Sequence, residues 1–134
     1  MRGIADTGFL VAFGNRSDRY HDWATRLAGE ISEPLLTCEA VLAETAFHLG
    51  SATLVFAMVR EGLVTIAFDC KAHMAQLTAL AMRYQDRKPD LADLCLIRMS
   101  ELFPTHPVLT VDKKDFRVYR RNRRQMIPTI FPDD

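Results

Sequence analysis

The sequence predicts an α/β protein in which a central parallel sheet of about four or five strands is flanked by helices on both faces. Short apolar runs alternate with longer segments in which apolar residues recur at helical spacing. Glycine, proline and capping residues separate these segments. Strands that alternate with helices pair in parallel, because each parallel connection needs a long crossover. We expect residues 1–134 to form one domain.

Each expected strand is a short apolar run bounded by turn residues or by the start of a helix. The first run ends at Asp6, and the fourth ends at Asp112. The last run is expected at an edge of the sheet. The expected strands cover residues 3–6, 35–37, 63–68, 108–111 and 126–131.

The expected helices carry apolar residues three and four positions apart. Gly50 and Gly62 stop two of them, because glycine readily takes the left-handed conformation that closes a helix. The expected helices cover residues 9–13, 19–30, 39–49, 51 to the stop at 62, 69 or 70 to 84, 91–102, and a short turn over 114–119.

The helix that begins after Pro89 has two carboxylates at its start. Asp90 can cap it by accepting hydrogen bonds from the free amides of the next turn. Asp93 falls in the first turn, where negative charge suits the positive end of the helix dipole. An ordinary well-capped helix shows the same pair, so this stretch alone does not define a site. Four apolar positions are expected on its buried face: Leu91, Leu94, Ile97 and Leu102.

Three other segments of the chain also carry an acid that is expected to lie near this helix start. Sites in parallel sheets form beyond the carboxyl ends of the strands, which is where Asp6 and Asp112 are expected. Asp93 starts the helix that leads to the fourth strand, so it can face the same edge. Glu44 lies in mid-helix among small and apolar neighbours, which favours contact with the protein rather than with open water. We therefore expect these four acids to converge.

Converging carboxylates need a counter-charge, since their mutual repulsion would otherwise raise their pKa values. Mg²⁺ or Mn²⁺ takes oxygen ligands and resolves this repulsion. Such a cation also activates water and stabilises charge on a phosphate. The histidines and cysteines show no spacing typical of zinc ligands. The sequence therefore predicts a site for Mg²⁺ or Mn²⁺.

Four short motifs occur in order along the chain: D-T-x-F-L-V-A from Asp6, L-A-E ending at Glu44, D-L-A-D-L-x-L-I from Asp90, and L-T-V-D-K-K-D-F around Asp112. Together they resemble PIN-domain ribonucleases, and more narrowly the VapC toxins of bacterial type II toxin–antitoxin pairs. The resemblance spans nearly the whole chain. It implies a Mg²⁺- or Mn²⁺-dependent endonuclease acting on RNA (tRNA or rRNA), inhibition by a cognate antitoxin protein, and a homodimer.

The resemblance also implies roles for single residues. Thr7 would help to hold the metal site through its hydroxyl or amide, and Thr110 would orient the loop before the fourth acid. The catalytic acids and metal ligands by resemblance are Asp6, Glu44, Asp93 and Asp112.

Asp90 and Asp115 are accessory acids by resemblance. The short D-K-K-D-F turn could present either Asp112 or Asp115 as the fourth ligand. One departure from the family pattern follows the third acid, where Leu94 replaces a small residue and Cys95 stands where another small side chain is common. This departure concerns the packing around the acid and leaves the acid itself in place.

The net charge is zero, with 17 basic and 17 acidic residues, but the charges are unevenly distributed. Residues 113–124 read KKDFRVYRRNRR, with Phe116 and Tyr119 between the cations. Such a run is either a solvated or oligomer-facing surface, or a footprint for a phosphate backbone. The residues expected to bind RNA are Arg83, Arg87, Lys88, Lys113, Lys114, Arg117, Arg120 and Arg121.

Composition favours a cytoplasmic protein that does not insert into a membrane. The sequence is 49% hydrophobic and 25% charged, and no apolar run approaches the roughly 20 residues that a membrane helix needs. The N-terminus shows no signal-peptide pattern. Cys38, Cys70 and Cys95 form an odd set without a C-x-x-C pair, which is typical of reduced thiols packed as small core residues.

The leading interpretation is a metal-dependent endoribonuclease toxin. The first alternative is a non-catalytic PIN-like module that binds RNA or a protein partner. The second is a phospho-acceptor signalling domain, which normally carries adjacent acids after its first strand. Here Ala5 precedes Asp6 and Thr7 follows it, which argues against that class.

Overall fold

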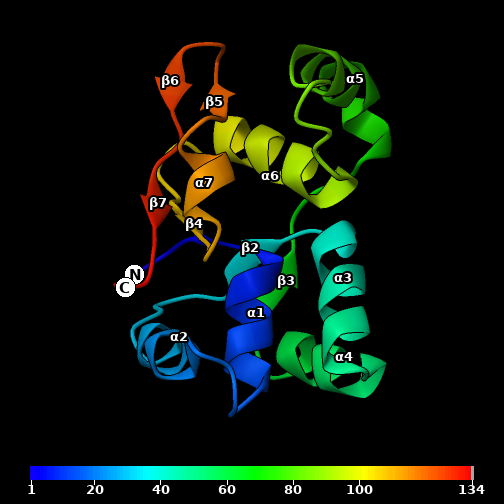
Figure 1. Cartoon of the computed structure of the whole chain (residues 1–134). Coiled ribbons are helices and arrows are strands. Elements are labelled where there is room, and N and C mark those ends of the chain that lie inside the picture. Colours follow the sequence, from blue (N-terminus) through cyan, green and yellow to red (C-terminus); the bar gives the residue numbers. More distant parts are fainter. Residues whose placement is uncertain (134) are drawn as a thin grey trace.

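The computed structural model describes residues 1–133, and at its centre lies a five-stranded parallel sheet (Figure 1). The strand order is β3-β2-β1-β4-β7. In the register, Ile4 of the central strand lies opposite Leu36 on one side and Val108 on the other. The strands are β1 (Ile4–Ala5), β2 (Leu35–Thr37), β3 (Val64–Ile66), β4 (Val108–Leu109) and β7 (Thr129–Ile130). The predicted α/β class is confirmed.

Helices flank this sheet on both faces. The chain steps from β1 through β2 to β3 and then returns to β4 on the other side of β1. Right-handed crossovers therefore place the helices before and after that return on opposite faces. In Figure 1, α1 lies in front of β2 and β3, whereas α5 and α6 lie in the upper part of the view. The helices are α1 (Thr7–Gly14), α2 (His21–Ala28), α3 (Glu39–Leu49), α4 (Ala52–Arg60), the 3-10 helix η1 (Lys71–His73), α5 (Met74–Arg83), α6 (Leu91–Leu102) and α7 (Lys113–Phe116).

The reversal of the strand order creates a crevice at the carboxyl ends of β1 and β4. These strands are neighbours, but their connections leave toward opposite edges of the sheet. Loops therefore diverge at this point and leave room for a ligand. Asp6 follows β1 directly, and Asp112 follows β4 after two residues. The topology thus positions the first and fourth predicted acids, Asp6 and Asp112, at the same crevice.

Helix α6 is buried on most of its circumference and packs against β1, α3 and α5. Its middle positions, Leu94 to Ile97, are at most 8% exposed. Leu91 and Leu102 were expected on its buried face, but they are 54% and 37% exposed. That expectation was wrong because the two leucines occupy the first and last positions of the helix, beyond the elements that cover its centre.

Several element boundaries differ from the predicted ones. The helix predicted over residues 19–30 begins only at His21, because Asp18 accepts a hydrogen bond from the Tyr20 amide (2.8 Å) in a preceding turn. The helix predicted from residue 69 or 70 is divided into η1 and α5 at His73, whose φ is −122°. The His73 ring stacks on Phe68, with the ring centroids 5.0 Å apart.

The C-terminal segment contains a hairpin that the sequence did not predict. The single strand expected over residues 126–131 is two strands, β6 (Gln125–Met126) and β7, separated by a stretch that includes Pro128. Strand β6 pairs antiparallel with β5 (Arg120–Arg121) outside the main sheet. Asn122 and Arg123 make the turn with φ values of 48° and 71°. The helical turn predicted to reach Tyr119 ends at Phe116, which leaves room for this hairpin.

The three cysteines are free thiols near the centre of the fold. Cys38 and Cys95 are buried, as expected of core residues, whereas Cys70 is half-buried. The sulfur atoms of Cys70 and Cys95 lie 3.5 Å apart. None of the described helices combines the length and the apolar character that crossing a bilayer requires.

Candidate metal centre

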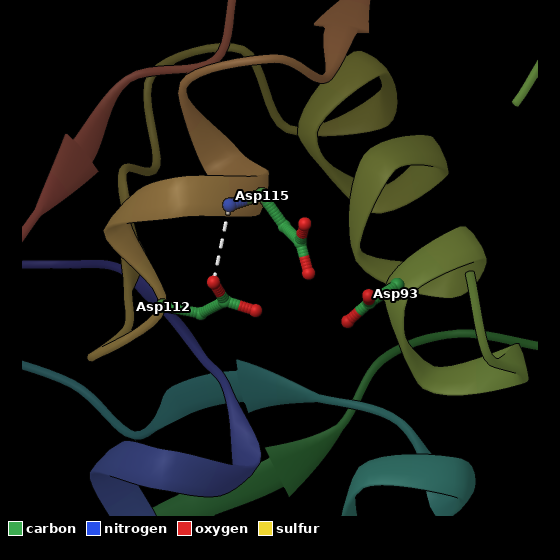
Figure 2. Close-up of side chains that lie close together, drawn as sticks. All are labelled: Asp93, Asp112 and Asp115. Carbon is green, nitrogen blue, oxygen red and sulfur yellow. Dashed lines mark hydrogen bonds between the residues drawn. The ribbon is translucent and has the colours of Figure 1, made fainter. Parts of the chain in front are cut away.

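Three carboxylates converge between helices α6 and α7. Asp93 lies in the first turn of α6, Asp112 is the N-cap of α7, and Asp115 lies in the first turn of α7. One oxygen from each of them lies within 4.8 Å of the other two. Figure 2 shows the three side chains pointing toward one another across the space between the two helices.

The same kind of N-cap hydrogen bond orients the acids at the start of both helices. The Asp93 amide donates to Asp90 Oδ1 (2.9 Å), and the Asp115 amide donates to Asp112 Oδ1 (3.1 Å). In each case an N-cap aspartate satisfies the amide three positions later. The capped first turn then holds a second aspartate at a defined orientation. The predicted cap by Asp90 is confirmed.

Asp6 lines the same pocket as this cluster and is only 7% exposed. Its Oδ1 accepts a hydrogen bond from the Thr7 amide (2.7 Å), and its Oδ2 accepts one from the Thr110 hydroxyl (2.6 Å). The Thr110 hydroxyl also accepts from the Asp112 amide (3.0 Å). Thr110 therefore connects the first acid to the backbone of the fourth.

Glu44 approaches the same site from helix α3. It is half-buried and accepts a hydrogen bond from the Thr7 hydroxyl (3.1 Å). Asp6, Glu44 and the exposed Asp90 line an open pocket of about 600 Å³ together with the three clustered aspartates. The structure thus brings all six predicted acids to one pocket, although the close group contains only Asp93, Asp112 and Asp115.

Burial makes the charged forms of these acids costly. It is the largest cause that raises the pKa of Asp6 to about 6 and the pKa of Asp93 to about 7, and the charge of Asp90 adds to both. Burial also raises the pKa values of Glu44 and Asp112. An all-oxygen donor set with unfavourable negative charge fits a hard divalent cation such as Mg²⁺ or Mn²⁺. The residues present therefore suit the predicted metal.

The chain is similar to proteins of known structure and sequence, although no family model matches it. The chain is 24% identical over 123 residues to ribonuclease VapC26 of Mycobacterium tuberculosis, covering 87% of this chain and 91% of the relative. The fold matches the crystal structure of M. tuberculosis VapC20, described as a sarcin–ricin loop cleaving toxin. The TM-score is 0.67 at 20% identity, over 81% of this chain and 87% of that one. The chain has the PIN-like fold of a VapC toxin. The resemblance predicted from the four motifs is confirmed.

Two cations reach the acidic pocket of this PIN-like fold from the loop between α5 and α6. Arg87 and Lys88 line the pocket, and the Arg87 guanidinium pairs with Asp115 Oδ1 at 2.6 Å. Asp115 raises the pKa of Arg87 through this hydrogen bond. Arg87 thus offsets part of the negative charge at the site.

One residue that was predicted to bind RNA, Arg121, lies in the core instead. Arg121 is only 4% exposed, and its guanidinium donates to the carbonyl oxygens of Ser100 (2.9 Å) and Pro104 (3.0 Å). This cation is therefore part of the core. Its neighbour Arg120 is half-buried and donates to the carbonyl oxygens of Arg117, Val118 and Tyr119.

The other predicted RNA-binding cations lie at or near the surface. Arg83, Arg87, Lys88, Lys114 and Arg117 are exposed, and Lys113 is half-buried. The Arg117 guanidinium lies over the Phe131 ring at 5.9 Å. Only the Arg87–Lys88 pair among these six lines the acidic pocket. Their contact with RNA stays a prediction.

Sequence reasoning did not single out Tyr119 as a residue of the site. Its position between arginines suggested an aromatic side chain interleaved in a basic surface. In the structure the side chain is 1% exposed and its hydroxyl donates to Asp93 Oδ2 at 2.8 Å. No local pattern signals this contact, because the two residues are 26 positions apart in the sequence.

Proposed function

We propose that this PIN-like protein is a metal-dependent endoribonuclease that cleaves RNA phosphodiester bonds, and that residues 1–134 form one nuclease domain. The observation that carries the proposal is the convergence of Asp93, Asp112 and Asp115 at the switch point of the sheet. Two similarities support it: VapC26 is named a ribonuclease, and VapC20 is described as a cleaving toxin.

In this proposal Asp93, Asp112 and Asp115 hold Mg²⁺ or Mn²⁺, so both aspartates of the D-K-K-D-F turn serve as ligands. Asp6 and Glu44 complete the acidic pocket. When bound, the cation activates a water molecule and offsets charge on the phosphate, so that no side chain has to act as a covalent nucleophile.

The other residues of the proposed site either orient the acids or bind the RNA. Thr110 joins Asp6 to the Asp112 amide and thereby keeps the loop after β4 in register with the end of β1. Arg87 and Lys88 lie at the pocket and can bind the phosphates that flank the scissile bond. Lys114 and Arg117 extend this basic surface along the segment after β4.

We further propose that the chain is the toxin of a type II toxin–antitoxin pair, is inhibited by a cognate antitoxin, forms a homodimer and acts in the cytoplasm on tRNA or rRNA. Exposed aromatic residues support a protein partner, since Phe47 on α3 is 81% exposed and Phe56 on α4 is 64% exposed. Three free thiols are typical of a reducing compartment.

The test is incubation of the purified protein with a cellular RNA pool in Mn²⁺ or Mg²⁺, followed by mapping of the fragment ends. We expect discrete cuts that disappear in EDTA and fall roughly 100-fold or more in Asp93→Asn, because that variant loses one charged ligand. Asp22→Asn is the matched control, since Asp22 is exposed on α2.

Calorimetry with Mn²⁺ separates the enzyme from a non-catalytic binding module. A folded parent protein that binds RNA, fails to bind Mn²⁺ and cuts none of several RNAs would show that the chain is the binding module instead. Cleavage by Asp93→Asn at the parental rate would contradict the role assigned to that acid.

A further inference from the structure

Among the described residues, Tyr119 is the tyrosine whose hydroxyl contacts one of the three aspartates of the acidic cluster. Its hydroxyl donates to Asp93 Oδ2 at 2.8 Å. The ring is held edge-on by Tyr84 (centroids 5.2 Å apart) and by Phe116 (5.4 Å). Because the side chain is 1% exposed and contacts a ring on two sides, it has little freedom to rotate away from Asp93.

Tyr119 also connects the two helices that carry the carboxylates. Its backbone amide, three residues beyond the end of α7, donates to the Asp115 carbonyl oxygen of that helix (3.0 Å), while its hydroxyl donates to Asp93 on α6. One residue is thus bonded through its main chain to the segment of Asp115 and through its side chain to Asp93.

The contact suits an outer partner of a metal ligand. A carboxylate can accept about four hydrogen bonds or ligand contacts, so one hydroxyl orients Asp93 without using up its capacity for a cation. Residues that orient a ligand in this way typically contribute 10–100-fold to metal affinity or activity. A buried tyrosine hydroxyl also needs a partner, and the carboxylate meets that need.

We propose that Tyr119 is a positioning residue that holds the Asp93 carboxylate in the orientation required to bind the divalent cation. This inference rests on the proposed function, because it assigns a role toward the proposed metal. According to this inference, Tyr119 faces the metal site and is not one of the aromatic residues that the basic run over residues 113–124 suggested would face RNA.

The test compares Tyr119→Phe with Tyr84→Phe. Both variants keep the ring pair and remove one hydroxyl, but the Tyr84 hydroxyl accepts a hydrogen bond from the Arg120 amide (2.9 Å) rather than from an acid. The measurements are the Mn²⁺ dissociation constant from calorimetry, the melting temperature in EDTA, and the cleavage rate as a function of Mn²⁺ concentration.

We expect the Mn²⁺ dissociation constant to rise about 10–100-fold in Tyr119→Phe and to change less than about 3-fold in Tyr84→Phe. Cleavage by Tyr119→Phe should recover at high Mn²⁺ while the KM for RNA stays at the parental value, a rescue that a loss of packing would not produce.

The inference would be overturned if Tyr119→Phe bound Mn²⁺ as tightly as the parent. It would also be overturned if Tyr84→Phe lost as much Mn²⁺ affinity as Tyr119→Phe. A parent protein that binds no Mn²⁺ would overturn the proposed function and this inference together. Normal Mn²⁺ binding by the parent with an unaffected Tyr119→Phe would overturn the inference alone.

Discussion

Thr110 shows at the scale of one residue how the site is held together. Its fully buried hydroxyl donates to Asp6 Oδ2 and accepts from the Asp112 amide. One oxygen atom therefore satisfies a buried carboxylate and a loop amide that lie on neighbouring strand ends. A side chain without a hydroxyl would leave both groups without this partner.

Thr110→Val is expected to lower the free energy of unfolding by about 1–3 kcal/mol, since it keeps the shape of the side chain and leaves Asp6 under-bonded. Thr110→Ser should retain most of the stability because it keeps the hydroxyl. Urea unfolding in EDTA measures both variants. A Thr110→Val protein as stable as the parent would show that water or another group replaces the lost hydrogen bond.

The β5–β6 hairpin is the element whose role the sequence did not reveal. Its Arg121 guanidinium reaches the C-terminal end of α6 and binds the carbonyl of Ser100, and it also binds the carbonyl of Pro104 just beyond that helix. Carbonyl groups at a helix C-terminus lack partners within the helix, and a cation there is favourable. The hairpin thus stabilises the helix whose other end carries Asp93.

Arg121→Met is expected to reduce the free energy of unfolding by about 2–3 kcal/mol, because it removes hydrogen bonds from a charged donor to buried acceptors. Arg123→Met is the matched control, since Arg123 is exposed in the same hairpin, and should change the free energy by less than about 0.5 kcal/mol. Denaturant unfolding compares them. Similar losses in both variants would contradict the assignment of Arg121 to the core.

At the scale of the whole molecule, the acidic pocket couples stability to pH and to metal. The pKa values of Asp6 and Asp93 are raised from a usual value of 3.8 to about 6 and about 7, with burial as the main cause. Between pH 4 and pH 7 the folded protein therefore holds protons that the unfolded chain has released. The contribution of these groups to stability falls as the pH rises through this range.

We expect the melting temperature of the EDTA-treated protein to fall between pH 5 and pH 7.5, and Mn²⁺ to restore it at pH 7.5 by binding the deprotonated carboxylates. Asp93→Asn should show a smaller decrease with pH, because one titrating group is removed. Calorimetric melting measures both proteins. Parallel pH profiles for the parent and the variant would contradict the pKa assigned to Asp93.

Much of the fold and part of the candidate site could be predicted from local patterns. The boundaries of α3 and α6 agree with the prediction from apolar spacing and capping. The predicted cap by Asp90 places Asp93 in the first turn, and the ends of β1 and β4 bring Asp6 and Asp112 to one edge. These features depend on residues within about four positions of one another or on the order of the strands.

The sequence by itself therefore determined the α/β class and most of its helices and strands, and it predicted that Asp6, Glu44, Asp93 and Asp112 converge. Only the tertiary structure decided which of those acids lie closest together, that Tyr119 holds Asp93, and that Arg121 is a core residue. The reason is physical: caps and periodicity act within a few residues, whereas the burial and partners of a side chain depend on the packing of segments far apart in the sequence.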